Sequence, residues 1–357
     1  MTKVTKATPA QINHLDSLYQ GRALYFGDLH NHANTGGTSD GKRTLEHWKG
    51  ALEALSMDFV GILDHRQVRH MYLPEWEDGL FICGTEPGAV IKDCVAIGGH
   101  NDIHYNMLFP SPVELEELLA EWPRYEFTGG AEGHFRYPSF TRAEMVELIN
   151  TVLSKGGFWV QPHPKQQLQS HDPMDYYFRD ETGLEAFYGD MRNEATRQNY
   201  KLWCDLLALG KRIFVCAGED GHACARDTAL TAIYAGEKSS AGFLAHLRVG
   251  DFVCGSVAMR MCAGDTRMGG KCVFNGQKLT VSVDKFHVSV KDPLHKYELV
   301  ILDDQGEIAR RRITCTEPAY YSLTTEESAK FYRAEVFDVS QDLRIAIGNP
   351  IWNETYL

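Results

Sequence analysis

The chain has 357 residues, which is long enough for two domains, or for one enzyme barrel with a smaller appendage. Hydrophobic residues make up 43% and charged residues 24%, an ordinary globular composition that excludes a disordered chain. With 36 basic and 48 acidic side chains the formal net charge is −12, so the sequence argues against nonspecific binding to nucleic acid or to an anionic membrane surface.

Cysteine usage and the first residues bear on the compartment. Nine cysteines contain no CxxC pair, and an odd number suits neither a disulfide framework nor a zinc ribbon. The first 22 residues lack an apolar signal-peptide core, and no stretch approaches the roughly 18 apolar residues of a membrane span. We therefore expect a cytoplasmic protein that does not bind membranes.

Short apolar runs alternate with helical patterns over about the first 250 residues, as in βαβ units. Ser111 and Thr141 each precede a helical pattern with a glutamate three residues later, which predicts two N-caps, and a third helix is expected from about Asn193. The predicted strands are residues 23–27, 59–63, 80–84, 158–161, 183–187 and 212–217, with one more at either 94–98 or 103–108.

Repeated strand, helix, strand units predict a parallel sheet, whose natural form at this length is a closed or nearly closed barrel. From residue 256 apolar and polar residues alternate with a period of two, as in β-strands, and a turn is expected at 303–306. We predict a barrel domain at 1–255 and an antiparallel β-sandwich at 256–357, in which 259–270 is either a linker or the first strand. The sandwich strands are expected at 279–283, 286–290, 298–302 and 331–336.

Histidines and carboxylates cluster directly after the predicted strands. In a parallel barrel the carboxyl ends of all strands open on one face, so residues far apart in sequence converge there. This pattern predicts a single site built from many loops. The residues concerned are Asp28, His30, His32, Asp64, His65, Glu86, His163, Glu219, Asp220 and His222.

These residue types favour a metal site. Imidazole and carboxylate are ligands for divalent Zn, Mn or Fe, and the cluster contains no cysteine that would indicate structural zinc. The spacing of His30-x-His32, and of Asp220-x-His222, points both side chains of each pair to one side of an extended chain. One such pair alone would be better explained by surface or core histidines, whereas five strand ends of this kind together indicate metal binding.

The motifs resemble the signature of the polymerase and histidinol phosphatase (PHP) superfamily of metallohydrolases, in the order of that family. The resemblance implies a distorted (β/α)7 barrel. The β-rich tail, with its late 348–352 segment, resembles the branch that includes carbaryl-type ester and carbamate hydrolases. The matching segments are Asp28-x-His30-x-His32, Ser39-Asp40-Gly41, Asp64-His65, Glu86, His163-Pro164 and Asp220-x-His222.

The resemblance also implies two to three divalent ions. One would take His30, His32, Glu86 and Asp220; a second would share Glu86 and take His163 with a further histidine; a third would take Asp40, His65 and His222. The further histidine is one of His100, His104 and His134, and His104 is preferred because 103–107 resembles the family's apolar strand.

Two features depart from the family pattern. The link between His32 and Ser39 is longer than in compact members, which puts the approach of Asp40 to the metals in doubt. Glu219 stands where a small residue commonly precedes the final aspartate, and it adds negative charge near the site.

Two ions bridged by Glu86 would lower the pKa of a bridging water and present hydroxide to an electrophilic phosphorus or carbonyl. The residues expected to act in catalysis are Glu86, Asp220 and His222, with His222 or a metal-bound water protonating the leaving group. The candidate contacts to the substrate are Arg66, Lys165 and Arg226, and for each of them the alternative is an ordinary surface charge.

The sequence therefore predicts a metal-dependent hydrolase that acts on a small, anionic molecule and not on nucleic acid. Phosphoester hydrolysis is the leading reaction, because it is the commonest in the superfamily that the chain resembles. Hydrolysis of a carbamate, ester or amide at the same site is the alternative. A non-catalytic metal-binding scaffold is the alternative from another class.

Overall fold

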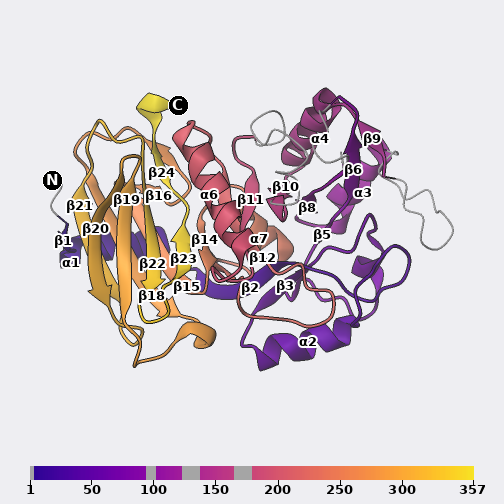
Figure 1. Cartoon of the computed structure of the whole chain (residues 1–357), viewed down its shortest axis with the longest axis horizontal. Coiled ribbons are helices and arrows are strands. Elements are labelled where there is room, and N and C mark those ends of the chain that lie inside the picture. The colour runs from indigo at the N-terminus through magenta and orange to yellow at the C-terminus, as the bar shows by residue number, and fades with distance from the viewer. Residues whose placement is uncertain (1–3, 94–101, 123–136, 165–178) are drawn as a thin grey trace.

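The computed structural model describes residues 4–93, 102–122, 137–164 and 179–357. Within them the chain is a mixed α/β protein, with a helix-bearing part and a strand-rich part side by side (Figure 1). His100, His134 and Lys165, and the alternative strand at 94–98, lie outside the described residues.

The helix-bearing part is built on two sheets. In the first, β2, β3 and β4 run parallel, and β13 pairs antiparallel with β2. In the second, of order β12-β11-β10-β8-β5, the first three strands are parallel and β8 is antiparallel to both of its neighbours. Their bounds are β2 Ala23–Asn31, β3 Phe59–Ile62, β4 Phe81–Ile82, β5 Gly84–Thr85, β8 Asn106–Leu108, β10 Phe158–Gln161, β11 Gly183–Tyr188, β12 Phe214–Gly218 and β13 Thr231–Ala235.

The two sheets meet at two seams. At the first, β12 packs beside β2, and an isolated parallel bridge joins Asn31 to Gly221. At the second, β3 packs beside β5. The described strands thus enclose a barrel-like centre from two sheets, and a continuous ring of seven parallel strands is not present among them. A small separate sheet of β6 (Gly88–Ile91), β7 (Asp102–His104) and β9 (Ser139–Phe140) lies beyond β5.

Helices begin where their capping residues predict. Thr141 forms the reciprocal capping box with Glu144, and Asn193 accepts a hydrogen bond from the Ala195 N–H. Ser111 also caps its helix, but its hydroxyl donates to the carboxylate of Glu114 instead of completing the box. The α-helices of the described residues are α1 Pro9–Leu18, α2 Leu45–Ala54, α3 Pro112–Glu121, α4 Arg142–Ser154, α6 Glu194–Ala208 and α7 Ser240–Leu247. The short 3-10 turns in the described parts of the chain are η1 Arg69–Tyr72, η3 Val288–Val290 and η4 Glu354–Tyr356.

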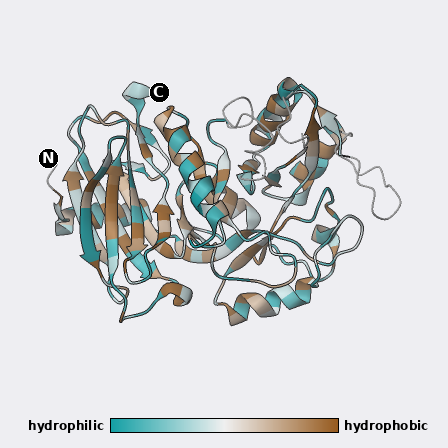
Figure 2. Ribbon diagram, viewed as in Figure 1, coloured by the Kyte–Doolittle hydropathy of each residue, from teal (hydrophilic) through white to brown (hydrophobic). Residues whose placement is uncertain are grey.

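The C-terminal part consists of strands that pair antiparallel, as expected from its period of two, except for the short parallel pair of β17 and β24. Polar and apolar residues alternate along these strands (Figure 2). Segment 259–270 contains the end of β15 and the short strand β16, which form a hairpin, and is therefore not a linker. Residues 288–290 of the predicted strand 286–290 form the η3 turn. The strands are β1 Thr5–Lys6, β14 Phe252–Gly255, β15 Val257–Ala263, β16 Thr266–Arg267, β17 Lys271–Cys272, β18 Lys278–Phe286, β19 Tyr297–Asp303, β20 Gly306–Ile313, β21 Ala319–Thr324, β22 Phe331–Asp338, β23 Leu343–Gly348 and β24 Ile351–Asn353.

Backbone pairing crosses the predicted boundary at residue 255 in both directions. β14 pairs with β13 on one side and with β23 on the other, so one sheet runs from the histidine-bearing strands into the C-terminal part. At the N-terminus, β1 pairs with β21, and α1 packs on β15 and β18. The division at 255 stays a prediction, and the hydrogen bonding shows that the two parts share a sheet.

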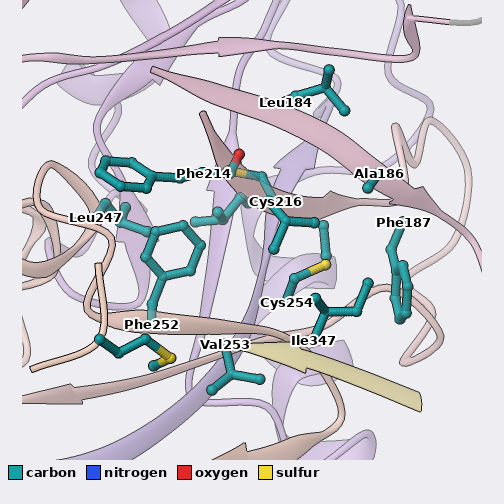
Figure 3. Packing of buried hydrophobic residues seen from close by; sticks show 14 of the residues in the cluster. Leu184, Ala186, Phe187, Phe214, Cys216, Leu247, Phe252, Val253, Cys254 and Ile347 are labelled. Carbon is teal, nitrogen blue, oxygen red and sulfur yellow. The ribbon is translucent and has the colours of Figure 1, made fainter. Parts of the chain in front are cut away.

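The apolar core is continuous across this junction. Leu184 and Phe214 of the second sheet pack near Phe252 and Cys254 of β14 and Ile347 of β23 (Figure 3). Burial of such side chains contributes about 25 cal/mol for each Å² of apolar surface removed from water. This contact holds the strands that carry the site against the C-terminal sheets. Among the described residues, no helix has both the length and the apolar character needed to cross a lipid bilayer.

Candidate metal centre

The end of β2 places the first two histidines. The carboxylate of Asp28 accepts the His30 N–H at 3.0 Å, and the His32 N–H donates to the Gly221 carbonyl at 2.9 Å. The second bond ties the His30-x-His32 segment to the loop after β12, which carries Asp220 and His222. The first and last motifs of the site, far apart in sequence, are therefore joined through their backbones.

Glu86 lies at the centre of the cluster and is fully buried. It follows β5, and its N–H donates to the Leu63 carbonyl after β3 at 3.0 Å. Its carboxylate lies within 3.3 Å of five imidazoles. The nitrogen–oxygen distances are 3.3 Å to His30, 3.1 Å to His32, 3.2 Å to His65, 3.1 Å to His104 and 3.1 Å to His163.

A second carboxylate, Asp220, faces the same histidines from the loop after β12. Its Oδ1 lies 3.0 Å from His32 Nε2 and 3.5 Å from His30 Nε2. Asp40 lies on the outer side, with Oδ1 3.1 Å from His222 Nε2 and 3.6 Å from His65 Nε2. The long link before Asp40 therefore still brings this carboxylate to the cluster.

His104 reaches the site by a different route from the other histidines. It ends β7, just before β8, and β8 runs antiparallel to β5 and β10. The start of an antiparallel strand lies at the same edge as the ends of its parallel neighbours, so His104 faces Glu86. Its ring also lies 3.1 Å from the Tyr137 hydroxyl, and the Gln161 amide donates to its carbonyl at 3.1 Å.

Three non-glycine residues at the cluster adopt a positive φ. The values are 53° for Arg66, 28° for His163 and 51° for Asp220. Such backbone costs about 1–3 kcal/mol per residue and persists only where the surroundings impose it. Their concentration at this cluster indicates a site held in a specific geometry.

Neighbouring charged groups shift the pKa values of the side chains in the cluster. Burial alone would raise the pKa of Glu86, but His30, His104 and His65 hold it well below its usual range. Burial likewise opposes the contacts with Asp220 and Glu86, which outweigh it and raise the pKa of His32 to about 9. The pKa of Asp220 falls to about 2 because nearby imidazoles outweigh the effect of burial. The carboxylates are therefore ionised, as metal ligands must be.

The residues present fit divalent cations. Three buried atoms of the cluster, His30 Nε2, His32 Nδ1 and Glu86 Oε2, have no hydrogen-bond partner among the described residues. Buried polar atoms are normally satisfied, and a cation would use such imidazole and carboxylate lone pairs. Within the described part of the chain, three sets of residues have possible metal-ligating atoms within 4.8 Å of one another: His30, His32, Glu86 and Asp220; His32, Asp40, His65 and His222; and His65, Glu86 and His104.

A cavity of about 310 Å³ adjoins the cluster beside Asp220 and His222. Its lining includes Tyr188, Asn193 and Arg226. The Arg226 side chain is 65% exposed and lies 4.0 Å from the carboxylate of Glu219. Of the other predicted substrate contacts, Arg66 lies with its guanidinium carbon 4.7 Å from the centre of the Tyr137 ring, and Lys165 is outside the described residues.

Sequence reasoning missed two residues that touch the cluster. Glu185, on β11, lies 3.0 Å from His30 Nδ1, and the Tyr188 hydroxyl donates to Asp220 Oδ2 at 3.2 Å. An ionisable residue inside the apolar run 183–187 was the available signal for Glu185. Tyr188 carried a weaker signal, because an aromatic residue at a strand end is common.

Comparison with known proteins gives neither a matching family model nor a matching curated protein. Among solved structures, a two-domain protein from Bacteroides vulgatus, described as containing a PHP-like metal-dependent phosphoesterase, is 12% identical with a TM-score of 0.41, over 93% of this chain and 96% of that one. Endonuclease Q from Pyrococcus furiosus, described as lesion-specific, is 14% identical with a TM-score of 0.43, over 67% and 62%. An amidohydrolase from Chromobacterium violaceum is 13% identical with a TM-score of 0.34, over 55% and 87%.

All three neighbours are described as hydrolytic enzymes or as containing one. At this level of identity and superposition they assign no function to the chain. The function proposed below rests on the geometry of the site.

Proposed function

We propose that this protein is a metal-dependent phosphoesterase acting on a small anionic substrate. The observation that carries the proposal is the central position of Glu86, whose buried carboxylate contacts five imidazoles from four different segments. A buried carboxylate among so many imidazoles is typical of a bridging metal ligand and has no evident structural purpose.

The donor sets suggest how two to three divalent ions, of Zn, Mn or Fe, would be held. His30, His32, Glu86 and Asp220 would hold one ion. Glu86 and His104, with His163 or His65, would hold a second. A third would lie between Asp40, His65 and His222, where His32 Nδ1 also points. When bound, these ions would supply Lewis-acid activation of water and neutralise developing negative charge.

The chain's own groups would orient the substrate and move protons. Asp220 is anchored by the Tyr188 hydroxyl and borders the cavity, where it can accept a proton. When only two ions are bound, His222, which borders the same cavity, can donate a proton to a leaving oxygen, because its contact with Asp40 raises the pKa of its imidazole. Arg226, exposed in the cavity wall, is placed to attract an anion into an otherwise acidic protein.

The size of the cavity favours a small substrate. About 310 Å³ lies at the lower end of the range for small-molecule pockets, about 300–1,000 Å³. Its walls include a hydroxyl from Tyr188 and an amide from Asn193, which suits a polar leaving group. These features support a phosphomonoester of a small polar alcohol over a large apolar ester.

The experiment combines metal analysis with a substrate panel. Protein purified without chelator, and protein reconstituted with Mn, Fe or Zn, is analysed for metal and assayed with phosphomonoesters, aryl esters, carbamates and a DNA oligonucleotide. We expect at least two ions per chain and the highest kcat/KM on a phosphomonoester, with chelator-treated protein inactive. One ion or fewer would overturn the polynuclear centre. A preference for esters, carbamates or DNA, or metal binding without hydrolysis, would overturn the phosphoesterase.

A further inference from the structure

Glu185 is a buried acid outside the proposed donor sets. Its neighbours Leu184 and Ala186 join the apolar core (Figure 3), and alternation along β11 turns Glu185 to the opposite face, toward the cluster. The side chain is 1% exposed. Burying a carboxylate is costly unless it is paired, so its partners indicate why it is there.

Each carboxylate oxygen has one partner, and the two partners come from opposite sides of the site. Oε1 lies 3.0 Å from His30 Nδ1, at the end of β2. Oε2 accepts the backbone N–H of His163, after β10, at 2.8 Å. Because a carboxylate only accepts, Nδ1 of His30 must carry a proton, and Nε2 is the nitrogen left to bind a cation.

That orientation matches the rest of the cluster. His30 Nε2 lies 3.3 Å from Glu86 Oε2 and 3.5 Å from Asp220 Oδ1, and it has no hydrogen-bond partner among the described residues. His163 adopts a φ of 28°, which an imidazole-bearing residue rarely does, and the bond from its N–H to Glu185 restrains that backbone. One carboxylate thus sets the ring of one histidine and the backbone of another.

The neighbouring strand leaves space for the Glu185 carboxylate, and a hydrogen bond from α6 holds the Glu185 backbone in place. A β-carbon at Gly218, on the adjacent β12, would lie 2.0 Å from Glu185 Oε1, so only glycine fits there. The register between β11 and β12 shifts between Glu185 and Phe187. At this shift the Asn199 side chain of α6 donates to the Glu185 carbonyl at 3.2 Å.

We propose that Glu185 is a positioning residue of the metal centre, which holds His30 and His163 so that both of their rings meet Glu86. The inference rests on the proposed function, because it concerns the same metal ions. It goes further by naming a residue that touches no ion and yet sets the affinity for one. Partners of this kind typically change metal affinity by 10–100-fold.

The decisive substitution is Glu185→Gln, which keeps the shape and removes one acceptor. Both partners of Glu185 present an N–H, and a glutamine has a single acceptor oxygen, so its amide N–H₂ would face a second donor. Glu185→Asp keeps both acceptors on a shorter side chain. Glu335→Gln is the matched control, because Glu335 is equally buried but bonds Arg333, Arg344 and Tyr200 in the C-terminal part and α6.

Metal-free wild-type protein and these three variants are titrated with Mn²⁺ and Zn²⁺ by calorimetry, and their unfolding in urea is compared. We expect Glu185→Gln to weaken the tightest ion by about 10–100-fold. Glu185→Asp should recover part of that loss, and Glu335→Gln should bind metal like wild type. Nitrogen NMR of the Zn²⁺-loaded protein should show a proton on Nδ1 of His30 in wild type, and this signal should be lost or shifted in Glu185→Gln.

Wild-type metal affinity in Glu185→Gln, or equal losses in Glu185→Gln and Glu335→Gln, would overturn the inference. If wild type itself binds no metal, the proposed function fails first, and the two failures are distinguished. If Glu185→Gln does not fold, the Nδ1 proton of His30 in the wild-type Zn²⁺ form decides: its absence would overturn the assignment.

Discussion

Replacing Glu86 by glutamine should disable the metal centre while leaving the fold in place. The substitution keeps the volume of a fully buried side chain and removes only its charge. Glu86 belongs to two of the three sets of possible metal ligands, so the substitution removes one ligand from both sets. It leaves Asp40, His65 and His222 of the remaining set unchanged. The variant therefore separates the ions that depend on Glu86 from the one that does not.

The magnitude follows from the contacts. Residues that contact a metal ligand but not the metal change metal affinity by about 10–100-fold, so the loss of a charged ligand should weaken the binding of both dependent ions by more than about 100-fold. Metal ions contribute several kcal/mol of transition-state stabilisation. A loss of about 4 kcal/mol, at 1.36 kcal/mol for each factor of ten, lowers kcat/KM by about 10³-fold.

The Glu86→Gln substitution should lower the free energy of unfolding of the metal-free protein by less than the loss of a buried ion pair would suggest. Breaking a buried ion pair usually costs about 3–5 kcal/mol, because the partner charge is left uncompensated. The imidazoles around Glu86 can release their protons instead, which limits this cost. Urea unfolding of the metal-free variant should therefore still be cooperative, with a free-energy loss below that range.

The assay is elemental analysis and steady-state kinetics of Glu86→Gln beside wild type and Glu335→Gln. We expect Glu86→Gln to retain at most one ion per chain and about 10⁻³ of the wild-type kcat/KM, whereas Glu335→Gln keeps its metal. A Glu86→Gln protein with wild-type metal content and activity would refute the central role of Glu86.

Three further predictions follow from the site and its surroundings. His104→Ala should lower kcat/KM severely and His100→Ala should lower it mildly. The control in the same kinetic assay is His287→Ala, because His287 is buried but lies away from the cluster. If His100→Ala had the larger effect, the further metal ligand would be His100. Inorganic phosphate should bind the metal-loaded protein in calorimetry and fail to bind the chelator-treated one, because the carboxylates leave the metal-free site negative; equal affinity would show an anion site built from basic side chains. Burial raises the pKa of Asp251, but His246, Arg267 and Tyr19 outweigh this effect and lower it. The ionised Asp251 therefore stabilises the fold at pH values above its unfolded pKa of about 3.9, and this stabilisation disappears as the pH falls through the lower folded pKa. Asp251→Asn should therefore cost about 3–5 kcal/mol in urea unfolding at pH 7 and progressively less below about pH 4, and a pH-independent difference would contradict this account.

The order of strands and motifs was readable from the sequence because it depends on local chemistry. Apolar runs at 59–63 and 158–161 become β3 and β10, and the capping residues Thr141 and Asn193 begin their helices as predicted. Histidines and carboxylates after these strands were correctly expected to converge, since parallel strands end at one edge. The sequence by itself thus determined which motif residues would lie close together, and metal binding by them stays a prediction.

Tertiary structure decided what depends on the neighbour that each strand selects. The antiparallel pairing of β8 delivers His104 to Glu86, and no local period reveals the direction of a three-residue strand. Glu185 reads as part of an apolar strand until β2 and the loop after β10 bring His30 and His163 to its two oxygens. The pairing of β14 with β23 joins the two parts in one sheet across the predicted boundary. In each case the partner lies far away in sequence, so its position is fixed by packing and hydrogen bonding between distant segments.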